Sequence, residues 1–228
     1  MKAALLLFGF LLQAGVAAAV PPAVCPVADK VGDCVIFSFA WDKAAVPKYT
    51  IVVQEDRIVH YWEDDSPYDE VQRAKPSLTV NDSTFKRIFA ATDPGIFQDC
   101  ESKARNIAQT GEKTVRWYNG DQYVGCTFNY SQNTRLNEIV ATFMAMAQTI
   151  QFGDKLKHDQ RFDRLGLDAE MDALVEEVKD GRAIEVQNIA PVLQSLVDDD
   201  RVMDRVKRKA ARLIQDASTS TPAAPTAR

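Results

Sequence analysis

Histidine is almost missing from this 228-residue sequence, which contains only His60 and His158. His158 has neither a second histidine nor a cysteine at the spacing of a metal site. His60 falls inside a predicted strand, where a histidine is typical of a structural position, and His158 belongs to a charged, solvated helix face. We therefore expect no metal site and no cofactor.

Motifs of nucleotide-dependent and nucleophilic enzymes are also missing. The chain has no Walker loop, no Gly-x-Gly-x-x-Gly turn and no Gly-x-Ser-x-Gly elbow, and its ten glycines are scattered at turns. The sequence thus offers no catalytic residue and favours a non-enzymatic protein. Acidic residues are plentiful, so a hydrolase of unfamiliar type that uses carboxylates is the alternative.

A basic excess is missing as well, because 27 Lys and Arg face 32 Asp and Glu, for a net charge of −5. Nucleic-acid binders usually show a strong basic excess, so no nucleic-acid partner is expected. Beyond the first residues, no apolar run approaches the length of a membrane span. We expect no transmembrane span in the mature chain.

The N-terminus has the pattern of a secretory signal peptide. Lys2 precedes a short apolar run over residues 3–12, and the alanines at 17–19 supply a small-residue cleavage site. The run is too short to cross a membrane. The sequence therefore predicts a signal peptide over 1–19, a spacer over 20–33, and a secreted or periplasmic protein of a bacterial-type cell envelope.

All four cysteines follow the predicted leader: Cys25, Cys34, Cys100 and Cys126. An even number in an exported chain predicts two disulfides, for which three pairings are possible. Short loops close most easily, which favours Cys25–Cys34 and Cys100–Cys126. The alternatives are buried free thiols at Cys34 and Cys126, and a lipid anchor on Cys25.

Residues 34–151 have the pattern of an α+β domain, in which an antiparallel sheet packs against helices. Apolar and aromatic residues predict a hairpin over 48–62 and a second one over 113–130, the latter with an Asn119-Gly120 turn. Asn81 or Asp82 is predicted to cap a helix. The stretch 96–108 is ambiguous, with a helix expected over its first half only and a strand over 105–109 as the alternative. A long amphipathic helix is predicted from Thr134 to Gln151, ended by Gly153.

Residues 154–216 predict an all-α extension of about three to four helices. Three apolar stripes with helical spacing follow one another, and short helices cannot bury such stripes singly. Leu165-Gly166-Leu167 predicts a tight corner, with Asp168 capping the next helix. The tail 217–228 is small, polar and proline-bearing, and is expected to be disordered.

The aromatic side chains give the candidate binding site. Trp117 and Tyr118 are neighbours in one strand, so only one of them can face the core. Together with Trp62, they predict a patch on the outer sheet face, unless the helical segment covers it. From this we infer a binding or protein-interaction protein that works through the aromatic face or the helical surface.

The last helix suggests another partner. Its polar face carries six basic residues, Arg201, Arg205, Lys207, Arg208, Lys209 and Arg212. Such a helix can lie on anionic lipid or bind an acidic partner. A peripheral membrane protein is therefore a second alternative, although the helix lacks Trp and Phe and packing against a core is the simpler interpretation.

Overall fold

The computed structural model describes residues 25, 32–63, 78–89, 93–102, 106–120 and 122–220. The predicted leader over 1–19 and most of the spacer lie outside the described residues. So do positions 64–70, which form the acidic stretch after β3, and the last eight residues.

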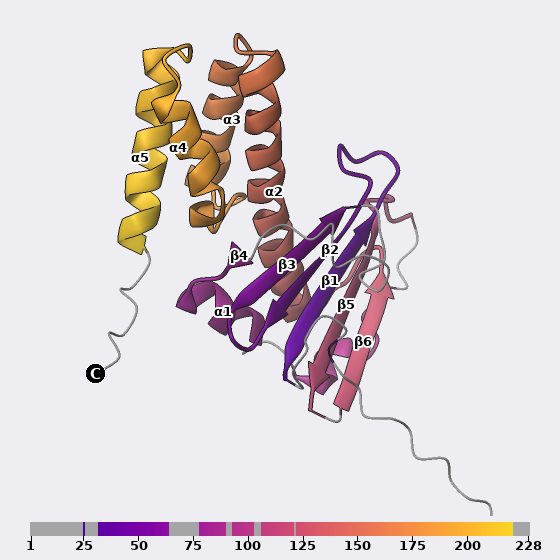
Figure 1. Ribbon diagram of the computed structural model, residues 1–228. Helices are drawn as coiled ribbons and strands as arrows, with labels where there is room; N and C mark the ends of the chain where they lie inside the picture. The colour runs from indigo at the N-terminus through magenta and orange to yellow at the C-terminus, as the bar shows by residue number, and fades with distance from the viewer. Residues whose placement is uncertain are drawn as a thin grey trace, which may run out of the picture.

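One six-stranded antiparallel sheet forms the first part of the chain, in the order β4-β3-β2-β1-β5-β6 (Figure 1). The strands are β1 (Cys34–Ala40), β2 (Lys48–Gln54), β3 (Ile58–Glu63), β4 (Leu78–Thr79), β5 (Glu112–Asn119) and β6 (Gln122–Phe128). β1 lies between β2 and β5 and is almost wholly buried, as its apolar sequence requires. The predicted α+β class is confirmed.

Seven helical segments lie within the described residues. They are α1 (Asp82–Phe89), η2 (Pro94–Phe97), α2 (Thr134–Phe162), α3 (Leu167–Lys179), η3 (Val186–Ile189), α4 (Ala190–Asp198) and α5 (Asp204–Ser220). The predicted cap of α1 is confirmed, because the Asn81 side chain accepts from the Thr84 N–H at 2.8 Å. In the ambiguous stretch after it, the helix amounts to the single 3-10 turn η2.

Both predicted hairpins form, but the second has a different turn. Asn119 pairs with Gln122 at the end of the β5–β6 ladder, so the two-residue connection begins at Gly120 rather than Asn119. Gly120 has φ of +54° and donates its N–H to Asp33 at 3.1 Å. The positive φ that the turn needs is therefore taken by glycine at the first connecting position, one residue later than predicted.

The two faces of the sheet bury different side chains. Val35, Phe37 and Phe39 of β1 point to the face covered by α2, where Phe37 stacks on Phe143 with ring centroids 5.4 Å apart. Alternate residues point the other way, as the period of a strand dictates. On that outer face Cys34 and Ile36 belong to a smaller buried cluster.

Helix α2 is longer than the sequence pattern predicts, and the prediction that Gly153 ends it is wrong. The helix continues for 29 residues to Phe162 and contributes to both hydrophobic cores, one under the sheet and one among the C-terminal helices (Figure 1). A Cβ on Gly153 would lie 2.5 Å from Cγ2 of Ile189. Glycine at this position therefore lets η3 approach the middle of the helix.

The C-terminal helices share one core, which confirms the predicted all-α extension. Its fully buried side chains include those of the three predicted stripes, namely Leu167, Met171, Leu174, Leu193, Leu196, Val206 and Ala210. α5 continues to Ser220, past Ala217, where we expected the disordered tail to begin. The stripes thus bury one another and the second half of α2.

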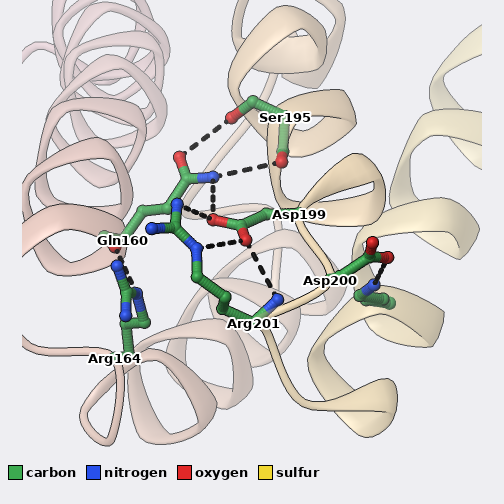
Figure 2. A network of polar contacts seen from close by, with 7 residues as sticks. Gln160, Arg164, Ser195, Asp199, Asp200 and Arg201 are labelled. Atoms are coloured by element: carbon green, nitrogen blue, oxygen red, sulfur yellow. Dashed lines mark hydrogen bonds and ion pairs between the residues drawn. The ribbon is translucent and has the colours of Figure 1, made fainter.

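A polar network ties the end of α2 to the α4–α5 connection (Figure 2). The Gln160 amide donates to the Ser195 carbonyl at 3.1 Å and to Asp199 at 3.3 Å. Asp199 also accepts from the backbone and guanidinium of Arg201, which holds the pKa of this carboxyl well below its usual range. The network joins two turns at one end of the extension.

The corner between α2 and α3 forms as predicted, but the predicted cap by Asp168 is wrong, because Asp168 lies inside the first turn of α3 and Gly166 takes the N-cap position without a side-chain cap. Asp163 stabilises the corner by accepting from the Gly166 N–H at 3.1 Å through its side chain. Asp168 instead pairs with Arg205 at 2.8 Å and Lys209 at 3.0 Å. Asp168 therefore joins α3 to α5 instead of capping its own helix.

The extension is hydrogen-bonded to the β4 edge of the sheet. The Asn188 side chain accepts from the Thr79 N–H and donates to the Thr79 carbonyl, both at 2.9 Å. Glu185 accepts from the Asn81 N–H at 3.0 Å, and Thr149 donates to the Ile184 carbonyl at 2.6 Å. The short η3 segment therefore serves as a cover for this sheet edge.

Acidification is expected to destabilise the sheet through His60. Its ring stacks on Trp62 with centroids 5.7 Å apart and contacts the Gln54 side chain at 3.2 Å. Desolvation lowers its pKa, and the Asp56 charge opposes the shift without cancelling it. The unfolded chain then binds more protons, so stability falls as pH drops below about 6.5.

The measurement is the free energy of urea unfolding at about pH 7.5 and about pH 5.5, on either side of the unfolded-state pKa. His60→Gln keeps an amide that can face Gln54 and removes the titrating group. The loss of stability on acidification should be smaller in His60→Gln than in the wild-type protein. Equal losses in the two proteins would contradict the assignment to His60.

Candidate binding groove between α3 and α5

The three predicted binding aromatics do not form one exposed patch. Trp62 and Tyr118 lie together in the buried outer-face cluster, 1% and 9% exposed, whereas Trp117 packs partly buried on the opposite face. As the sequence predicts, the neighbours Trp117 and Tyr118 face opposite ways. Among the described residues, the exposed aromatic side chains are Tyr123 at 50%, Tyr130 at 47% and Phe162, at the end of α2, at 74%.

Both predicted disulfides are present, Cys25–Cys34 and Cys100–Cys126, so the preferred pairing is confirmed. The first lies in the outer-face cluster beside Trp62, and the second ties β6 to the segment after η2. Two disulfides are compatible with an oxidising, extracytoplasmic location.

Within the described ranges, no helix is both long enough and apolar enough to cross a bilayer. Across the same residues, no group of three or more His, Cys, Asp or Glu side chains is arranged to hold a metal ion.

The carboxylate-hydrolase alternative requires two acids at one accessible cavity. Glu185 and Asp216 line a cavity of about 240 Å³ beside η3. One Glu185 oxygen accepts from Asn81 and Gln187, and the other is sealed from solvent without a partner. The hydrogen bond from Asn81 to Glu185 joins the extension to the sheet.

A larger cavity, of about 550 Å³, lies between α3 and α5. Val175, Val178 and Leu213 supply its apolar surface. Its charged lining consists of Lys179, Arg205, Arg208, Lys209, Arg212 and Asp216. We call this cavity the basic groove.

The basic groove follows from the way α5 packs. Val206 and Ala210 are fully buried and Leu213 is 6% exposed, so the apolar stripe of α5 faces the helical core. The arginines and lysines between those positions must then lie along its sides and outer face. Lys179 in the last turn of α3 brings a further positive charge to the same cavity.

Two of the five cations are neutralised within the fold. Arg205 and Lys209 both pair with Asp168, and Lys209 also reaches Asp172 at 2.5 Å. The hydrogen bond from Lys209, helped by Arg205, lowers the pKa of Asp168, so this carboxylate stays charged. These contacts fix α5 against α3 and form one wall of the groove.

The other three cations have no such partner. Lys179, Arg208 and Arg212 are exposed and form no ion pair with any residue that the structure describes. Asp216 is the one acid in the groove lining, so the free charge there is positive. An apolar surface beside unpaired cations suits a ligand that is apolar on one side and anionic on the other.

Sequence patterns identified part of this site. The basic residues of α5 are visible as a group because they lie within one helix. Lys179 is separated from them by η3 and α4, and no local pattern links it to α5. The apolar residues Val175 and Val178 belong to a predicted stripe, which indicates burial but not that part of it borders a cavity.

No known protein-family model matches this chain, and no curated protein matches it in sequence.

Proposed function

We propose that this protein is an exported, non-enzymatic binding protein whose basic groove holds an acidic, amphipathic helix of a protein partner. The observation that carries the proposal is the set of three unpaired cations, Lys179, Arg208 and Arg212, beside an apolar surface. Carboxylates of the partner would pair with the cations, and its apolar side chains would cover Val175 and Val178. This is the helix-in-groove mode of recognition.

The dimensions of the groove suit a short helix. Its lining extends along α5 from Arg205 to Asp216. At 1.5 Å per residue this is about 16 Å, or three helical turns. Three turns present apolar residues at i, i+3 and i+7, enough to follow one side of the groove.

A polypeptide is favoured over a lipid surface by the burial of the apolar stripe of α5. Interfacial helices insert that stripe between lipids, but Val206, Ala210 and Leu213 are occupied in the helical core. The apolar surface that remains is recessed between two helices, where a flat bilayer does not reach. Export is supported by the predicted leader and by the two disulfides.

The proposal is tested with a synthetic helical peptide of about 14 residues, made of Glu and Ala with Leu at i, i+3 and i+7. Fluorescence anisotropy measures its binding to the wild-type protein and to Arg208→Glu/Arg212→Glu. We expect the double reversal to weaken binding by about tenfold or more, because two attractions become repulsions. Added salt should weaken wild-type binding.

The matched control is Lys157→Glu/Arg161→Glu, which makes the same change in net charge on exposed positions of α2 away from the groove. It should leave peptide affinity unchanged. A peptide of the same composition with scattered Leu should bind more weakly. Equal weakening by both double variants would overturn the proposal, as would binding to vesicles of anionic phospholipid without binding to the peptide.

A further inference from the structure

The two edges of the sheet differ in whether other described residues cover them. The β4 edge is covered by Asn188, which bonds both main-chain groups of Thr79. At the β6 edge no strand of the described ranges is paired, Tyr123 is half exposed, and Gly125 and Thr127 are exposed. β6 also contains no charge and no proline, the devices by which edge strands usually avoid pairing.

The main-chain groups at this edge are available for pairing. Asn119 and Gln122 close a two-residue hairpin, so their pair is hydrogen-bonded, and bonded and non-bonded pairs alternate from there. Tyr123, Gly125 and Thr127 fall at the non-bonded positions. Their N–H and C=O groups therefore point away from β5, and over the described residues no turn or loop backbone bonds to them.

A single cation lies beside the middle of this edge. Arg116 is directly across from Gly125, and a Cβ on Gly125 would lie 3.0 Å from Cγ of Arg116 and 2.8 Å from the Val115 carbonyl. The Arg116 side chain thus occupies the space that any larger residue at 125 would take, and it leans over β6. No described acid pairs with its guanidinium.

The neighbours of Arg116 on the outer face are uncharged. On one side the Tyr118 and Tyr123 rings lie 4.9 Å apart, and on the other the Thr114 and Thr127 hydroxyls are hydrogen-bonded at 2.8 Å. The edge therefore offers an aromatic surface, a cation and a small polar surface at successive outward positions along β6.

We propose that β6 binds an extended segment of a partner protein as a seventh strand, with an aspartate or glutamate opposite Gly125. A residue opposite Gly125 shares the outer face with Arg116, so its carboxylate meets the guanidinium. The residues two positions away pack on Tyr123 and Thr127. Main-chain bonds supply affinity and the carboxylate supplies the register, as in other complexes formed by strand addition.

A second copy of this chain fits the edge less well. Twofold pairing of β6 with itself about Gly125 would place glycine opposite glycine. Neither Arg116 would then gain a carboxylate, because β6 contains no acid. The charge on the edge therefore favours a partner segment that carries an acid, and this inference does not depend on the basic groove.

The experiment uses the full mature protein and a blocked synthetic heptapeptide, Ser-Thr-Val-Glu-Val-Thr-Ser, with a lysine-centred control peptide. Amide hydrogen exchange followed by NMR should show fast exchange at Tyr123, Gly125 and Thr127 without peptide. The glutamate peptide should slow exchange at these three amides and leave Val124 and Cys126, already bonded to β5, unchanged.

Charge exchange tests the register. Arg116→Glu should lose about tenfold in affinity for the glutamate peptide and gain it for the lysine peptide, whereas Arg135→Glu, an exposed control on α2, should change neither. Arg208→Glu/Arg212→Glu should bind both peptides as the wild-type protein does, which separates this site from the groove. Equal binding of the two peptides by the wild-type protein, or dimerisation that protects the three amides without peptide, would overturn the proposal.

Discussion

Replacing Cys100 and Cys126 together by alanine is expected to lower the free energy of unfolding by about 3.5 kcal/mol. The bond closes a loop with a sequence separation of 26 residues, and the chain-entropy relation for a loop of that length gives this figure. For the Cys25–Cys34 bond, with a separation of 9, the same relation gives about 2.6 kcal/mol. Both losses are large against the usual 5–15 kcal/mol of a folded domain.

The structure shows why the longer loop should matter more. Cys100 is buried in the core under the sheet, at the end of a segment that carries the buried side chains Ile96 and Phe97 of η2. Beyond it, Ser102 donates to the Tyr130 carbonyl at 2.8 Å, and Glu101 accepts from the Asn129 N–H at 2.8 Å. Without the disulfide, the segment is held in place by hydrogen bonds such as these and by its core contacts.

The measurement is urea unfolding of the wild-type protein, each cysteine-pair variant and the variant without cysteines, with and without reductant. Reductant should lower the midpoint of the wild-type protein and leave the cysteine-free variant unchanged. The Cys25/Cys34 pair serves as the matched control, since loss of the shorter loop should cost less. If removal of Cys100 and Cys126 costs no more than removal of Cys25 and Cys34, the loop-length argument is wrong for this protein.

Local patterns were sufficient for most of the sheet and for the disulfides. Runs of β-branched and aromatic residues define β2, β3 and β5, and short loop closure selects the correct cysteine pairing. These features depend on residues close together in sequence. The turn begins at Gly120, one position later than predicted. Asn119 and Gly120 both tolerate positive φ, so the local sequence does not show which of them starts the turn, and the register of the β5–β6 ladder determines it.

Features that depend on residues far apart in the chain could not be predicted from local sequence patterns. Trp62 and Tyr118 belong to strands at different positions in the sheet, and their burial together depends on the β3-β2-β1-β5 order. Lys179 reaches the basic groove only because α3 and α5 pack together. The open β6 edge likewise follows from the strand order, which no single strand pattern specifies.

Gly153 is the clearest case in which a glycine needed for close packing against a distant residue was interpreted as a local helix end. Glycine is typical of helix ends, and a helix was therefore predicted to stop there. In the structure it lies inside α2, where a Cβ would stand 2.5 Å from Cγ2 and 3.2 Å from Cβ of Ile189. Ile189 is buried in the helical core, and branching at its Cβ limits how far that methyl can move.

Gly153→Leu is expected to destabilise the protein by about 3 kcal/mol, because its side chain must displace Ile189 and the η3 segment that covers the β4 edge. Gly153→Ala introduces a smaller clash and gains about 1 kcal/mol of helix propensity, so its net cost should be about 1 kcal/mol. Ile189→Ala removes the opposing methyl and alone costs about 2–5 kcal/mol.

The decisive comparison is the sign of the change in the free energy of unfolding that Gly153→Ala causes in the wild-type protein and in Ile189→Ala. In the wild-type protein it should be destabilising, but in Ile189→Ala it should be stabilising, because the 2.5 Å contact with Cγ2 is gone and the remaining 3.2 Å contact with Cβ needs a shift of only a few tenths of an ångström, which costs less than the helix propensity gains. Urea unfolding of the four proteins of this cycle measures the coupling. Additive effects would show that the glycine is not needed for the approach of η3, and the continuity of α2 between the two cores would then need another explanation.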